Sequence, residues 1–143
     1  MSIILAKNAT KMYQSGARHT LALNEVSFEV ADGEFVVILG QSGAGKSTLL
    51  NILGGIDCLS SGEILVNNLP LSKMKENELA SYRANDTGFI FQFYNLIPTL
   101  TVYENIALMR DIKDDILDPA VILDRVGLKQ HFRKFPSQLS GGE

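Results

Sequence analysis

In a chain of 143 residues, one segment reads GQSGAGKS: Gly40-Gln41-Ser42-Gly43-Ala44-Gly45-Lys46-Ser47. It matches the pattern G-x-x-x-x-G-K-[ST], in which a glycine-rich loop between a strand and a helix binds phosphate. At ordinary residue frequencies, on the order of 0.005 such matches would arise by chance in this length. An apolar run at 35–39 precedes the loop, and leucine and isoleucine recur at helical spacing after it. We therefore predict a buried strand at 35–39, the loop, and a helix over about 45–57.

Each residue type in this loop suits a nucleotide phosphate. Glycine tolerates backbone conformations that aim several amides at one anion, and the start of a helix adds about half a positive charge. Lys46 is expected to reach the β- and γ-phosphates, and the Ser47 hydroxyl is expected to ligate Mg²⁺. The predicted nucleotide-binding residues of the loop are Gly40, Gln41, Ser42, Gly43, Ala44, Gly45, Lys46, Ser47 and Thr48.

The remaining sequence alternates between strand and helix patterns, which is typical of an α/β fold. Strands are expected at 3–13, 21–30, 63–66 and 88–91, and a helix is expected at 76–84. Asp32-Gly33 predicts a tight turn before 35–39. After Pro98 the pattern becomes helical, with a capping box from Thr101 to Glu104 and a helix that opens at Asp118-Pro119 and closes at Gly127.

Composition limits the classes of protein that the chain can belong to. The sequence is 45% apolar and 20% charged, which predicts one hydrophobic core. Its formal net charge of −3 provides no basic surface, so nucleic acid is not expected as a partner. One cysteine, Cys58, allows no internal disulfide. Neither a signal peptide nor an apolar run near the roughly 20 residues of a membrane-spanning helix is found, so we expect a soluble chain.

The final residues, Leu139-Ser140-Gly141-Gly142-Glu143, narrow the choice among phosphate-binding proteins. They resemble the signature sequence, LSGGQ or LSGGE, of ATP-binding-cassette (ABC) ATPases. With the phosphate loop ahead of it, the chain resembles the ATP-binding subunit of an ABC transporter over nearly its whole length. The segments 61–63 and 95–105 are most similar to the branch that serves lipoprotein release and macrolide export.

The resemblance implies roles for further residues. Tyr13 stands where the family has an aromatic side chain that stacks on adenine, although a tyrosine is also an ordinary strand residue. Gln92, expected at the end of the strand at 88–91, stands where the family has a glutamine that touches Mg²⁺ and the attacking water. Lys46 and Gln92 are therefore the implied catalytic residues, and Ser47 and Gln92 the implied metal-binding residues. Ser140, Gly141 and Gly142 would cover the γ-phosphate of an ATP held by a second subunit.

The family also implies an architecture, partners and a location. The fold would be a P-loop NTPase core with an antiparallel β portion and part of the helical subdomain, incomplete at the carboxyl end. All 143 residues would form a single nucleotide-binding domain, with the core at 1–92 and the partial helical subdomain at 93–143. The partners would be an integral-membrane permease and a second ATPase subunit, arranged head to tail as a homodimer. The chain would lie at the cytoplasmic face of the inner or plasma membrane.

In the family, a strand ending in Asp-Glu and a later histidine follow the signature, and only one residue follows Gly142 here. We therefore expect a truncated piece of a longer ATPase that binds nucleotide without efficient turnover. Because the run at 35–39 would lack its neighbouring strand, we expect the piece to swap domains, to oligomerise or to expose that apolar edge. Two alternatives stay open. One is a nucleotide-binding or dimerisation module without ATPase activity. The other is a soluble ABC-type ATPase of DNA repair, although the segment between Gln92 and Gln138 has no room for the long insertion of that class.

Two further interpretations concern single side chains. Phe89, Phe91, Phe93, Tyr94 and Leu96 are predicted to belong mostly to the core, with a partner-facing role for Tyr94 and its neighbours as the alternative. Neither His19 nor His131 has neighbours typical of a ligand site, so neither histidine is assigned a role.

Overall fold

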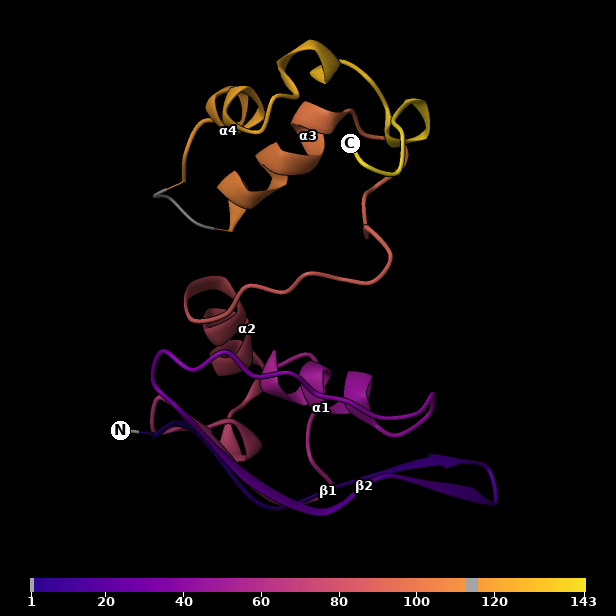
Figure 1. The fold of residues 1–143 in the computed structure, drawn as a ribbon, viewed down its shortest axis with the longest axis vertical. Helices are drawn as coiled ribbons and strands as arrows, with labels where there is room; N and C mark the ends of the chain where they lie inside the picture. Colours follow the sequence, from indigo (N-terminus) through magenta and orange to yellow (C-terminus); the bar gives the residue numbers. More distant parts are fainter. Residues whose placement is uncertain (1, 113–115) are drawn as a thin grey trace. The chain divides into compact units, whose positions relative to one another are not determined.

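The computed structural model describes residues 2–112 and 116–143. The chain divides into two compact units, one ending at Phe89 and the other beginning at Ile90. Figure 1 shows a sheet with helices α1 and α2 in the first unit, and helices α3 and α4 in the second. No helix in the described ranges is long and apolar enough to span a bilayer.

The first unit is built on a four-stranded antiparallel sheet with the order β2-β1-β3-β4. Its strands are β1 (Ser2–Ser15), β2 (Arg18–Ala31), β3 (Ser61–Val66) and β4 (Leu69–Pro70). β1 and β2 form a hairpin whose two-residue turn begins at Gly16, at a φ of 59° that favours glycine. The predicted strands at 3–13, 21–30 and 63–66 are therefore confirmed.

Two helices complete the core of this unit. Helix α1 (Lys46–Leu53) buries Leu49 and Ile52, and helix α2 (Glu76–Asn85) buries Leu79 and Tyr82. The Tyr82 hydroxyl donates a hydrogen bond of 2.7 Å to the carbonyl oxygen of Leu53, which ties α2 to the end of α1. These side chains form one cluster with the small buried residues of β1, so the sheet and both helices share a single core.

Two predicted strands are not formed. Residues 35–39 have no regular secondary structure, and Phe35 and Leu39 are 91% and 86% exposed. Residues 88–91 are also irregular, and Ile90 is 97% exposed. A strand exists only through hydrogen bonds to a neighbouring strand. The sheet is antiparallel throughout, and none of its four strands pairs with 35–39. The run is exposed in this chain, which is one of the three expected outcomes, whereas its predicted strand conformation is wrong.

The second unit is helical. It contains α3 (Val102–Ala107), α4 (Pro119–Arg125) and three single 3-10 turns at Leu108–Asp111, Lys129–His131 and Pro136–Gln138. The predicted capping box is present, because the Thr101 hydroxyl accepts from the amide of Glu104 while the Glu104 carboxylate accepts from the amide of Thr101. The predicted start of α4 is also confirmed, since the Asp118 carboxylate accepts from the amide of Ala120.

The aromatic segment that enters this unit is mostly exposed. Phe91, Phe93, Tyr94 and Leu96 are between 43% and 77% exposed, so their assignment to the core was wrong. The segment has no regular secondary structure. Asn105 holds it instead, through bonds of 2.8 Å to the amide of Ile97 and 3.1 Å to the carbonyl oxygen of the same residue. Backbone hydrogen bonds to one polar side chain fix the loop without burying its apolar side chains.

Candidate nucleotide-binding site

The glycine-rich loop lies between the turn after β2 and the first residue of α1. Gly43 and Gly45 have φ angles of 81° and 84°, which favour glycine over any residue with a Cβ. A Cβ on Gly45 would lie 2.2 Å from the carbonyl oxygen of Ala22 in β2, so the loop passes directly over the sheet. A Cβ on Gly43 would meet no heavy atom within 4 Å. The loop is thus fixed at Gly45 and open at Gly43.

Lys46 and the start of α1 supply positive charge and free donors. The Lys46 ammonium donates hydrogen bonds of 2.8 Å and 2.7 Å to the carbonyl oxygens of Gly40 and Gln41. These contacts hold the ammonium against the loop. The first helical backbone bond runs from Leu49 to Gly45, so the amides before Leu49 have no acceptor within the helix. Together with the hydroxyls of Ser47 and Thr48, this donor set fits a phosphate group.

Tyr13 reaches the same region from β1. Its hydroxyl donates a hydrogen bond of 2.6 Å to Oδ2 of Asp57, which lies beyond the end of α1. Burial raises the pKa of the Tyr13 phenol, the Asp57 carboxylate raises it further, and the hydroxyl of Thr48 opposes both. The hydrogen bond to Asp57 therefore joins Tyr13 of β1 to the segment that follows α1.

Lys11 and Asp57 belong to this arrangement, and sequence reasoning missed both. The Lys11 ammonium lies 2.5 Å from Oδ1 of Asp57 and 4.9 Å from the centre of the Tyr13 ring. Alternation along β1 puts Lys11 and Tyr13 on one face, which the sequence could have shown. Asp57 is 46 residues from Lys11, and no local pattern marks their pairing.

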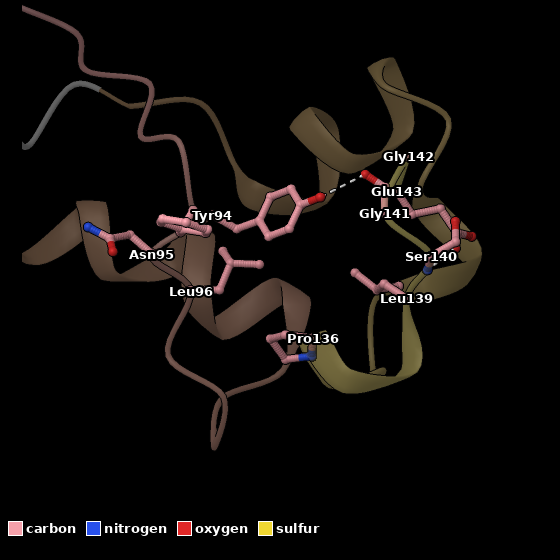
Figure 2. A pocket seen from close by; sticks show the side chains of 10 residues that line it. Tyr94, Asn95, Leu96, Pro136, Leu139, Ser140, Gly141, Gly142 and Glu143 are labelled. Atoms are coloured by element: carbon pink, nitrogen blue, oxygen red, sulfur yellow. Dashed lines mark hydrogen bonds between the residues drawn. The ribbon is translucent and has the colours of Figure 1, made fainter. Parts of the chain in front are cut away.

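Gln92 and the signature residues belong to the second unit. Gln92 is exposed and lies in a bend, so its predicted place at the end of a strand was wrong. The signature forms a closed turn, in which the amide of Ser140 donates a bond of 2.7 Å to the Glu143 carboxylate and the amide of Glu143 donates one of 3.1 Å to the Ser140 carbonyl. The Tyr94 hydroxyl donates a bond of 3.1 Å to the carbonyl oxygen of Gly141, as Figure 2 shows.

This signature turn borders a cavity of about 630 Å³ inside the second unit. Figure 2 shows the Tyr94 ring and the Leu96 side chain on one side, with Leu139 and the glycines opposite. A Cβ on Gly142 would meet no heavy atom within 4 Å. The turn is thus held at its ends and open at its second glycine.

His131 also supports the signature turn, although no role was assigned to it from the sequence. Its side chain is buried, and its Nε2 lies 2.8 Å from Oε1 of Glu143. Hydrogen bonds from the Ser140 backbone and hydroxyl lower the pKa of the Glu143 carboxyl, and the nearby charges of His131 and Lys134 lower it further. The signal that could have found this pair is weak, because one histidine eight residues before the start of a signature is not a motif.

Comparison with known proteins agrees with these features. The sequence profile of the family described as "ABC transporter" matches residues 23–143. An uncharacterized ABC transporter ATP-binding protein of Mycobacterium tuberculosis is 38% identical over 99% of this chain and 59% of its own length. A similarly described protein of Methanocaldococcus jannaschii is 43% identical over 99% of this chain and 65% of its own length.

Solved structures support the fold. The dimeric bacterial ABC transporter cassette MJ0796 is similar with a TM-score of 0.86 and 36% identity, covering 97% of this chain and 64% of that one. A second structure of MJ0796, bound to ADP and Pi, has the same TM-score at 35% identity. The predicted α/β cassette fold with an antiparallel portion is therefore confirmed. The chain spans about three fifths of the length of the curated relatives from M. tuberculosis and M. jannaschii, and it belongs to the ABC transporter family of ATP-binding proteins.

Proposed function

We propose that the chain is the ATP-binding part of an ABC transporter and couples ATP binding and hydrolysis to an integral-membrane permease. The observation that carries the proposal is the loop of the first unit. Gly43 and Gly45 adopt left-handed conformations there, and the Lys46 ammonium is hydrogen-bonded to the loop. The first backbone amides of α1 have no hydrogen-bond acceptor within the helix. That donor set has the chemistry that binds a triphosphate.

Different residues of the loop would bind different parts of Mg-ATP. Lys46 would leave its two carbonyl partners to bind the β- and γ-phosphates, and the backbone from Gly40 to Thr48 would surround them. Ser47 would ligate Mg²⁺, with Gln92 as a second metal-binding and water-positioning residue. Tyr13 would stack on the adenine. Bound Mg²⁺ would neutralise charge that develops on the phosphates.

The signature turn is proposed to act on a second subunit. Ser140, Gly141 and Gly142 would approach the γ-phosphate held by the partner in a head-to-tail homodimer, and the open side of Gly142 leaves room for that approach. The dimeric state of MJ0796 and the ADP and Pi bound to it support this proposal by similarity. In this arrangement one subunit's loop and the other's signature would form each site.

The remaining proposals concern the whole protein. We propose one nucleotide-binding domain over residues 1–143, with a core at 1–92 and a helical part at 93–143. It would act at the cytoplasmic face of the inner or plasma membrane, in the branch that serves lipoprotein release and macrolide export. The sequences at 61–63 and 95–105 support that branch. The exposed segment around Tyr94 supports a permease contact there.

For the 143-residue chain by itself we propose nucleotide binding without efficient turnover. No Asp-Glu pair follows the signature within these residues, so the base that would activate water is not among them. A phosphate-release assay at saturating Mg-ATP tests this, because turnover at the rate of an intact ABC ATPase would contradict it.

Isothermal calorimetry with Mg-ATP tests the proposed site. The native chain is expected to bind, and Lys46→Ala is expected to lose most of the affinity while it keeps its fold, since the Lys46 ammonium is hydrogen-bonded to carbonyl oxygens of the loop itself. Lys7→Ala is the matched control, because Lys7 is an exposed lysine of β1. Tight binding by Lys46→Ala, or no binding by a folded native chain, would overturn the proposal.

A further inference from the structure

We propose that Lys11 and Asp57 are positioning residues that hold the Tyr13 ring as a one-sided platform for the purine base. The proposal rests on the proposed nucleotide site and adds to it the two residues that set the base-binding surface. Both are charged side chains outside the glycine-rich loop, and their contacts converge on one aromatic ring.

Asp57 is the centre of this cluster. One of its carboxylate oxygens accepts from the Tyr13 hydroxyl at 2.6 Å, and the other accepts from the Lys11 ammonium at 2.5 Å and from the amide of Cys58 at 2.7 Å. The Lys11 ammonium also donates a bond of 2.7 Å to the carbonyl oxygen of Cys58. These hydrogen bonds and the ion pair therefore join β1 to the segment that follows α1, and each one restricts the side chains that make the others.

The geometry leaves one face of the ring for a ligand. The Lys11 ammonium lies over the Tyr13 ring, 4.9 Å from its centre, and the Lys11 side chain is only 13% exposed. Tyr13 is 40% exposed. Because the ammonium and its stem cover one face, the opposite face is the one that remains available for stacking. A cation on the far side also orients the ring through its π-electrons.

A stacking surface is useful only when its tilt is fixed. A ring held at Cβ alone can turn about its χ angles, and binding a base must then order it at a cost in free energy. The bond from the Tyr13 hydroxyl to Asp57 fixes the far end of the ring, so the platform is ordered before the ligand arrives. Because Asp57 follows the end of α1, this bond also places the platform beside that helix.

A salt bridge that serves only stability would not need to be partly buried or to contact an aromatic ring. The ion pair between Lys73 and Glu63 in the same unit has a similar separation, 2.9 Å, and in the described residues neither of its side chains lies over an aromatic ring. It is also more exposed, at 71% and 34% for the two side chains, against 13% and 26% for Lys11 and Asp57. This pair is therefore a matched control for effects of charge and stability.

The test compares Mg-ATP with inorganic tripolyphosphate, which offers the loop the same phosphates and offers Tyr13 no base. Base stacking on an aromatic side chain is worth about 1–3 kcal/mol, so Tyr13→Ala should weaken ATP binding by roughly 5- to 150-fold. A smaller loss of ATP affinity, about 3- to 10-fold, is expected for each of the positioning variants Asp57→Asn, Lys11→Met and Tyr13→Phe, because the ring remains but is less well ordered. Affinity for tripolyphosphate should stay within about twofold for all four, because the loop is unchanged.

Conservative and control variants complete the design. Lys11→Arg keeps the cation over the ring and should restore most of the ATP affinity, whereas Lys73→Met and Glu63→Gln should leave both affinities unchanged. Thermal unfolding of every variant checks that binding is measured on folded protein. Should Asp57→Asn destabilise the fold, Tyr13→Phe tests the same bond without removing a charge.

The outcomes separate this inference from the function on which it rests. Unchanged ATP affinity in Asp57→Asn and Lys11→Met would overturn the positioning role while Tyr13→Ala and Lys46→Ala still report on the site. Equal losses for ATP and tripolyphosphate would also overturn it, since the effect would then act through the loop. A native chain that binds neither ligand would overturn the proposed function and this inference together.

Discussion

The Nε2 atom of His131 lies 2.8 Å from one carboxylate oxygen of Glu143, and the other oxygen of that carboxylate accepts from the amide of Ser140 at 2.7 Å. An ionised carboxylate only accepts, so Nε2 carries the proton of this bond. The buried Nδ1 of the same ring has no partner among the described residues. One buried imidazole therefore anchors the signature turn from the body of the second unit.

His131→Ala is expected to loosen the signature turn. Glu143 would lose its buried partner, and the bond that closes the turn at Ser140 would open more often. Hydrogen exchange of the Ser140 amide should speed up on the order of tenfold. His19→Ala is the control, because His19 is an exposed residue of β2. Unchanged exchange at Ser140 in His131→Ala would show that the imidazole does not hold the turn.

The two left-handed glycines of the loop should respond differently to alanine. Gly43→Ala is expected to cost about 1–2 kcal/mol of unfolding free energy, the penalty of the left-handed conformation alone, because a Cβ there meets open space. Gly45→Ala is expected to cost more, since its Cβ would also lie 2.2 Å from the carbonyl oxygen of Ala22. Urea unfolding followed by circular dichroism measures both. Equal midpoints for the two variants would contradict this account.

The sequence could predict the elements whose determinants are local. The capping box at Thr101 and the N-cap at Asp118 each depend on residues within a few positions, and both occur in the structure. The strands at 35–39 and 88–91 could not be decided in this way, because a strand needs a partner that local composition does not supply.

The candidate site also combines features that depend on local sequence with features that depend on long-range contacts. The glycine-rich loop is contiguous, so its pattern alone located Gly43, Gly45 and Lys46. The contacts of Tyr13 with Asp57 and of His131 with Glu143 join residues that are distant in sequence, and only the fold reveals them. Charged side chains on a strand or after a helix most often face solvent, so the sequence favoured no role for them.

Acid should remove part of the stability that Asp57 provides. Burial raises the pKa of the Asp57 carboxyl, but hydrogen bonds from Lys11, Tyr13 and Cys58 outweigh burial and leave the pKa below its ordinary value of about 3.9. Because the folded pKa is the lower one, the contribution is fully present above the unfolded value of about 3.9 and is lost as the pH falls through the folded value. The stability difference between the native chain and Asp57→Asn should therefore shrink below about pH 4.

Urea unfolding at pH 7 and at pH 3 measures that difference. Asp32→Asn is the control, because Asp32 is exposed in the turn after β2 and its substitution removes one acidic charge that is not part of the Asp57 cluster. A gap between the native chain and Asp57→Asn that is the same at both pH values would mean that the carboxylate contributes no net charge-dependent stability.

The apolar run at 35–39 should make the 143-residue chain self-associate. Phe35, Val37 and Leu39 are 91%, 62% and 86% exposed, and exposed apolar side chains that adjoin one another favour contact with a second molecule. The double substitution Phe35→Lys with Leu39→Lys is expected to shift sedimentation toward the monomer and to lower dye binding, with little change in unfolding free energy because both side chains make few contacts. The matched control is Met12→Lys with Leu21→Lys, which replaces an exposed apolar pair across the β1–β2 hairpin. If the native chain sediments as a monomer at every concentration, or if both double variants dissociate it equally, residues 35–39 are not the surface that associates.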